Sequence, residues 1–92
     1  MITAISFVNA DVHRIPEVAE KIAALEGVSE VYSVTGQIDL IVLVRVSDID
    51  DVAGVVADRL NKIEGVTSTE THIAFRTFSK HDLEAAFSLG LD

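Results

Sequence analysis

The sequence predicts a small α+β domain with the element order β-α-β-β-α-β. Three observations support this order: four segments have strand patterns, three of them alternating and one a short apolar run; two segments have helical periodicity; and one short motif occurs twice. The motif reads Leu-Glu-Gly-Val-Ser at residues 25–29 and Ile-Glu-Gly-Val-Thr at residues 63–67. Each copy follows an amphipathic segment and precedes a β-rich one, which indicates two related helix–strand units.

The first strand is expected at residues 2–9, where apolar and small residues alternate. A helix is expected to follow it, with Pro16 near its start, where the missing N–H costs nothing. Gly27 stands after its end, where a residue able to adopt φ > 0 is favoured. The apolar residues of this helix share one face: Val18, Ile22 and Leu25.

Residues 28–35 alternate as a second strand, residues 35–39 form a connector, and residues 40–44 are a continuous apolar run. A strand with one face in water alternates between apolar and polar residues. Since the run at residues 40–44 is apolar on both faces, we expect a second subunit to cover the sheet face that the helices leave open, as a two-fold dimer.

The second helix is capped by Asp48 or Asp50 and ends before Gly65. Its apolar residues share one face: Val52, Val55, Val56, Leu60 and Ile63. Residues 66–77 alternate as the fourth strand, and Ser79 to Leu89 is expected to form a short C-terminal helix with Ser79 as its cap. The order β-α-β-β-α-β is that of the ferredoxin-like sandwich.

Composition narrows the class of protein. Ninety-two residues are expected to form a single domain, residues 1–92, and the mean hydropathy of +0.39 indicates apolar surface buried against another copy. The net charge is −8 and the seven basic residues are scattered, which argues against direct binding to nucleic acid or to an anionic membrane. The chain has no cysteine, no signal-like N-terminus and no membrane-length apolar run, so a cytoplasmic location is expected.

Residues 34–42 and 63–71 resemble the effector-binding domain of the Lrp/AsnC regulators, also called the RAM domain. The most specific likeness is Thr-Gly-x-x-Asp at residues 35–39, followed after a helix by Gly-Val-x-x-Thr-x-Thr at residues 65–71. The resemblance covers essentially the whole chain. It implies a module for amino-acid sensing, linked to transcription regulation, that dimerises through its sheets as a dimeric α/β barrel. It also implies further assembly, up to an octamer of four dimers.

The resemblance also implies a site. Family effectors bind near the interface between dimers, where the Gly-x-x-Asp loop contributes main-chain groups and its acidic side chain. Carried over residue by residue, this nominates the following ligand-binding residues: Gly36, Gln37, Ile38 and Asp39, with Thr69 and Thr71 on the last strand. An aromatic residue is frequent in the family where this chain has Ile38.

Most family members carry an N-terminal helix-turn-helix domain, whereas here a strand is expected from residue 1 or 2. The chain therefore resembles the stand-alone form of the RAM domain. Without a DNA-binding domain of its own, any role in transcription is expected to be indirect, through assembly with a full-length relative.

Each nominated residue also has a purely structural interpretation. The Asp39 carboxylate suits an α-ammonium group, but it suits equally the backbone of its own turn. Gly36 either lets a ligand approach the backbone or supplies a positive φ. Thr69 and Thr71 face the same way on one strand, where threonine is in any case favoured.

Neither a metal, a cofactor nor a catalytic residue is expected. The three histidines, His13, His72 and His81, form no pair at ligand spacing, and the aspartates at 48, 50 and 51 lack the glycine and distal glutamate of a calcium loop. Two other functions stay open. One is a dimeric α/β-barrel enzyme of small oxygenase or isomerase type, for which His72 and Asp39 would have to converge in a closed cavity. The other is an ACT-like regulatory domain, which usually pairs through sheet edges.

Overall fold

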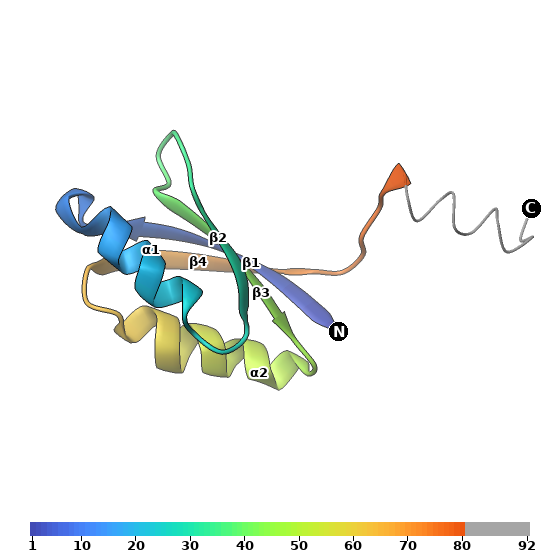
Figure 1. Ribbon diagram of the computed structural model, residues 1–92. Helices are drawn as coiled ribbons and strands as arrows, with labels where there is room; N and C mark the ends of the chain where they lie inside the picture. Colours follow the sequence, from blue (N-terminus) through green and yellow to red (C-terminus); the bar gives the residue numbers. More distant parts are fainter. Residues whose placement is uncertain (81–92) are drawn as a thin grey trace, which may run out of the picture.

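The computed structural model describes residues 1–80, which form one four-stranded sheet with two helices (Figure 1). The expected helix from Ser79 to Leu89 lies outside the described residues, apart from its first two positions. The main elements are β1 (Ile2–Ala10), α1 (Ile15–Ala23), β2 (Val28–Ser33), β3 (Leu40–Val46), α2 (Ile49–Ala53) and β4 (Val66–Ala74). Short helical segments are η1 (Val12–Arg14), η2 (Gly54–Arg59) and η3 (Leu60–Lys62).

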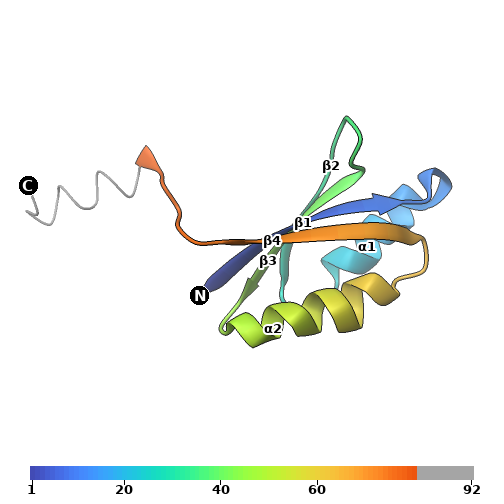
Figure 2. The same cartoon turned by 180° about the vertical axis from the view of Figure 1, so that it is seen from behind.

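The strand order in the sheet is β2-β3-β1-β4, and every neighbouring pair is antiparallel. Both helices lie on the same face of this sheet, as Figures 1 and 2 show from opposite sides. The predicted ferredoxin-like order is therefore confirmed, with β1 and β3 as central strands and β2 and β4 as edges. Among the described residues, no helix has the length and apolar composition that a membrane crossing requires.

The core lies between the helices and one face of the two central strands. Its fully buried strand residues alternate along the sequence: Ala4, Ser6 and Val8 on β1, and Leu40, Val42 and Val44 on β3. Val18, Ile22, Val55 and Leu60 cover them from the helical side. The residues between these core positions are half-buried and point to the uncovered side of the sheet, which we call the open face.

The second helical segment is continuous in Figure 1 but changes its hydrogen-bonding pattern twice. One α-helical turn is followed by a π-helical segment at Gly54–Arg59 and a 3₁₀ turn at Leu60–Lys62. Asp48 is the N-cap: its side chain accepts a hydrogen bond from the backbone N–H of Asp50 at 3.5 Å, which decides between the two expected caps.

The fourth strand is shorter than the sequence pattern predicts. The alternation of residues 66–77 continues past the point where β4 ends at Ala74. Ala74 pairs with Thr3, close to the beginning of β1, so residues 75–77 have no strand beside them to pair with. The second strand also ends earlier than expected, at Ser33, because the chain turns there toward β3.

Gly27 and Gly36 both have positive φ, of 94° and 106°, but their surroundings differ. A Cβ at Gly27 would lie 2.6 Å from Val55 Cγ2, whereas a Cβ at Gly36 would meet nothing within 4 Å.

Gly27→Ala should lower the free energy of unfolding by about 2–4 kcal/mol, since it adds a clash to backbone strain. Gly36→Ala, which adds strain alone, should cost about 1–2 kcal/mol. Denaturant unfolding checks the order, and equal losses would contradict the packing argument.

Candidate functional site

The connector between β2 and β3 is held against β1 by its last residue. The backbone N–H of Asp39 donates to the carbonyl of Val8 at 3.1 Å, and its carbonyl accepts from the N–H of Val34 at 3.1 Å. Its carboxylate accepts from the N–H of Ala10 through Oδ2 at 2.9 Å. Three hydrogen bonds at one residue therefore fix the base of the connector loop, residues 34–39.

Asp39 thus serves the fold, as the turn interpretation of its carboxylate expects. This does not prevent it from binding a ligand, since a carboxylate has two oxygens and about four acceptor positions. The bond from Ala10 orients the carboxylate, and a fixed carboxylate loses less conformational entropy when it accepts a further hydrogen bond.

The rest of the loop projects beyond the sheet, at the end of β2 in Figure 1. Gly36 and Gln37 are exposed and Ile38 is half-buried. Because Gly36 combines a φ of 106° with open space around its Cα, the glycine supplies the turn conformation and also leaves the backbone accessible. The two interpretations of Gly36 are compatible.

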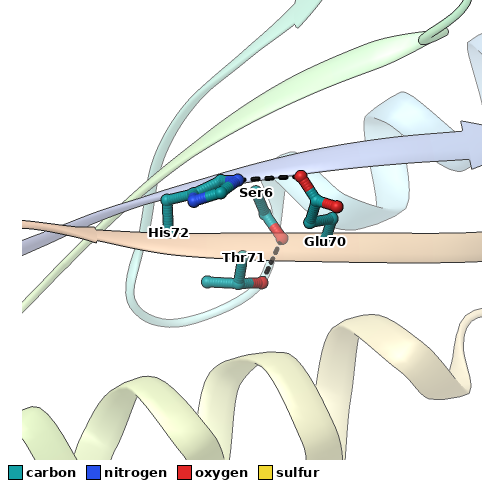
Figure 3. A network of polar contacts seen from close by, with 4 residues as sticks. All are labelled: Ser6, Glu70, Thr71 and His72. Carbon is teal, nitrogen blue, oxygen red and sulfur yellow. Dashed lines mark hydrogen bonds and ion pairs between the residues drawn. The ribbon is translucent and has the colours of Figure 1, made fainter.

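Thr69 and Thr71 face the same way, as expected, and they face the helices. The Thr69 hydroxyl donates to Asn61 Oδ1 at 2.7 Å, and the hydroxyl groups of Ser6 and Thr71 are 2.6 Å apart. Figure 3 shows the Ser6–Thr71 pair directed toward α2, on the opposite side of β4 from His72. Both threonines therefore have hydrogen-bond partners within the subunit.

The structure does not bring the threonines and the loop together within one subunit. Val8 lies opposite Leu40 on one side and opposite Thr69 on the other. Two strand spacings, about 10 Å, therefore separate the end of the loop from Thr69. A site that used both sets of residues would have to combine loop and threonines from different subunits.

Three hollows in the described part of the chain have volumes of about 370, 300 and 320 Å³. None of these three is lined by residues of the 34–39 loop, and Thr71 lines the second of them, between α2 and β4. The loop by itself offers backbone groups and a carboxylate but no enclosing wall. A small molecule bound there needs walls supplied by another chain.

The open face has an apolar centre made by the two central strands. Ile5 lies opposite Leu43, and Phe7 lies opposite Ile41. On β4, the His72 ring contacts Phe7 edge-on at 5.4 Å between ring centroids. His72 Nε2 also lies 2.8 Å from Glu70 Oε2, a pair drawn in Figure 3. The face therefore combines an apolar centre with an ionisable edge.

Two polar residues of β1 were not predicted to matter. Ser6 is fully buried among core residues, and the polar side chain at a core position of an alternating strand was the signal in the sequence. On the open face, Asn9 Nδ2 donates to Ser68 Oγ at 3.3 Å, while the buried Oδ1 of Asn9 has no hydrogen-bond partner among the described residues. Nothing in the sequence pattern singles out Asn9.

The remaining electrostatic features lie away from the loop. Arg14 and Glu64 form an ion pair at 3.0 Å, and this hydrogen bond and charge lower the pKa of the Glu64 carboxyl and raise the pKa of Arg14. The pair is exposed to solvent and screened, so it contributes little to stability. The described residues contain no cluster of three potential metal ligands.

Solved structures with this fold are close in shape. A crystal structure from Thermus thermophilus, TTHA0845, superposes with a TM-score of 0.82 at 42% identity and covers 87% of this chain and 100% of its own. E. coli AsnC superposes with a TM-score of 0.76 over 83% of this chain and 52% of its own; at 23% identity, it shows the fold alone. The class of protein is therefore a ferredoxin-like α+β domain.

Sequence comparison is more specific. Residues 3–83 match the family model of the Lrp/AsnC ligand binding domain. An HTH-type transcriptional regulator of Pyrococcus horikoshii is 44% identical over 61 residues, which are 66% of this chain and 41% of the regulator. The regulator LysM of Saccharolobus solfataricus is 38% identical over 63 residues, which are 68% of this chain and 44% of LysM.

The chain belongs to the Lrp/AsnC family, and it corresponds to the family's ligand-binding domain. It spans less than half the length of these two curated relatives, both of which are named as transcriptional regulators.

Asp39→Ala should lower the free energy of unfolding by about 1–3 kcal/mol, because it leaves the N–H of Ala10 without its acceptor. Asp39→Asn keeps an acceptor oxygen and should cost less than about 1 kcal/mol. Asp58→Ala, at an exposed aspartate of η2, serves as the control and should change stability by less than about 0.5 kcal/mol. Urea unfolding measures all three, and a neutral Asp39→Ala would show that the carboxylate does not hold the loop.

Proposed function

We propose that this chain is an effector-binding and oligomerisation module that acts in transcription regulation in the cytoplasm, and that it is not an enzyme. The effector is an amino acid or a similar small zwitterion. The observation that carries this proposal is the Gly36–Asp39 loop, which presents open backbone and an oriented carboxylate at the rim of the sheet. Backbone N–H groups suit an α-carboxylate, and a carboxylate suits an α-ammonium group.

The proposed site lies between subunits. The loop has no wall of its own, and Thr69 and Thr71 line a different part of the subunit, so contacts to an effector from all the nominated residues require a second subunit. An effector held there stabilises whichever assembly places the loop against its neighbour, which is regulation by population shift. The names of the relatives support the link to transcription.

Pairing of two open faces is the proposed basis of the dimer. Ile5, Phe7, Ile41 and Leu43 form a half-buried apolar patch on an antiparallel sheet, and a two-fold axis brings such a patch against itself. The result is the dimeric α/β barrel that the family resemblance implies. Assembly beyond the dimer, up to an octamer, and mixed assembly with a full-length regulator belong to the same proposal.

The arrangement of His72 and Asp39 gives no support to an enzyme. His72 lies opposite Ile5 on the open face, whereas Asp39 donates to Val8 and accepts from Ala10 at the end of β1. Three residues along β1 and two strand spacings separate the two side chains, so they do not converge on a substrate. General acid–base catalysis needs both groups within hydrogen-bond reach of one reacting centre.

Leu43→Glu should abolish pairing of the open faces and lower the assembled mass while the chain stays folded, because it places an unpaired carboxylate in the apolar centre of the open face. Light scattering gives the mass and circular dichroism confirms the fold. Ala23→Glu, which introduces the same carboxylate at an exposed position of α1, is the control and should leave the mass unchanged. An assembled mass equal to that of the wild-type chain would locate the interface elsewhere.

One member of a panel of amino acids should raise the melting temperature of the wild-type chain. A ligand at a hundred times its Kd stabilises a protein by about 2.7 kcal/mol, which corresponds to roughly 10–20 °C for a domain of this size. Asp39→Asn should remove most of this shift, since it neutralises the partner of the ammonium group, while Asp58→Asn should keep it. An equal shift in both variants would exclude Asp39 from the site.

A further inference from the structure

Residues 75–80, which we call the arm, continue from β4 and run away from the rest of the chain (Figures 1 and 2). Phe75 is 98% exposed and Phe78 is 81% exposed. Arg76 lies over the Phe78 ring, 5.5 Å from its centroid, so the arm presents aromatic and cationic groups together. Two exposed aromatic side chains on a six-residue segment indicate that the arm contacts another apolar surface.

An apolar groove of about 300 Å³ lies between α2–η2 and β4 on the helix side of the sheet. It is lined mainly by the following apolar residues: Ile49, Val52, Ala53, Val56, Ala57 and Ile73. Ile49 is 53% exposed and Ile73 is 39% exposed, although both line this groove. The groove has the size and lining to accept an aromatic side chain.

The arm does not occupy the groove of its own chain. Phe75 follows Ile73 by two residues in extended backbone, and the arm then passes beyond the end of the sheet instead of turning back along α2 (Figure 2). Phe78 would have to reverse its direction to reach Val56 or Ala57. A second copy of the chain meets no such obstacle.

The charges of the two surfaces are complementary. The arm carries Arg76 and Lys80 and no acidic residue, in a chain whose net charge is −8. The helical segment of the groove, residues 49–59, carries three aspartates and one arginine. Attraction between the basic arm and this acidic segment therefore favours docking, and it offsets the repulsion between two chains that are both acidic overall.

We propose that the arm of one chain docks in the α2–β4 groove of a second copy, with Phe75 and Phe78 as its apolar anchors. The occupant is a second copy of this chain because the arm and the groove match in apolar character and are opposite in charge. The contact uses the helix side of an edge strand. It is therefore separate from pairing of the open faces, and it does not depend on effector binding.

The chain has no cysteine, so disulfide trapping gives an unambiguous test. Chains with Phe78→Cys and chains with Ala57→Cys, carrying different tags, are mixed and oxidised. We expect a heterodimeric cross-link that neither variant forms with itself. A chain with both substitutions that traps only within itself would show that the arm folds back on its own groove, and absence of any cross-link would show that the groove is not its site; either result overturns the proposal.

A second measurement tests the same contact without cysteines. The double variant Phe75→Ser, Phe78→Ser changes only exposed side chains and should keep the circular-dichroism spectrum of the folded chain, while the concentration for half-dissociation of the assembly rises at least tenfold. Val12→Ser, at a residue that is 69% exposed and far from the arm in sequence, is the control. An unchanged dissociation midpoint for the double variant would overturn the proposal.

The same cross-link tested in the Leu43→Glu background separates the two contacts. We expect arm–groove trapping to persist when the open faces no longer pair, since the contacts lie on opposite sides of the sheet. A Leu43→Glu chain that no longer pairs through its open faces but still forms the cross-link would show that the arm–groove contact is separate. A chain that pairs through its open faces but forms no cross-link would overturn only the arm–groove contact.

Discussion

The rest of the structure depends on one constraint: both faces of the sheet are apolar at its centre, and the helices of the chain cover only one of them. On β3, Leu40, Val42 and Val44 are fully buried beneath α1 and α2, whereas Ile41 and Leu43 between them are only half-buried. An antiparallel sheet that faces water on one side normally alternates with polar residues there. A domain of this size also buries a modest share of its surface. The proposed pairing of open faces would therefore stabilise the same strand from its second side.

In the loop at residues 34–39, the residue proposed to bind the effector also holds the fold. Asp39 fixes the start of β3 through three hydrogen bonds to Val8, Ala10 and Val34, so the loop is rigid at its base and free at Gly36 and Gln37. A rigid base positions the backbone before a ligand arrives, which reduces the entropy lost on binding. Under the proposed function, a substitution at Asp39 would act on folding and on binding together, and only a substitution that keeps the acceptor would separate the two effects.

The sequence predicts the element order, an aspartate cap at Asp48 or Asp50 and the glycines after the helices, because these follow from local periodicity and local backbone preferences. The end of β4 could not be predicted, since it depends on where β1 begins and not on the alternation of residues 75–77. For the candidate site, the pattern places Thr69 and Thr71 on a common side but cannot say that this side faces α2, because that depends on the register of β4 against β1. The burial of Asn9 Oδ1 without a hydrogen-bond partner among the described residues likewise depends on how the strands pack, which the sequence pattern does not show.

In the proposed assembly, the two sides of the sheet make separate contacts, which matters for how the module would respond to an effector. Pairing of the open faces would leave α2, the edge of β4 and the arm at the outside of the dimer. A ligand at the loop would then shift the assembly by binding one arrangement of these outer contacts more tightly than another. Ser6 and Thr71, paired across β1 and β4 beneath that outer surface, tie the edge strand to the sheet centre. A contact at the edge of β4 therefore acts on a strand that is fixed to the core.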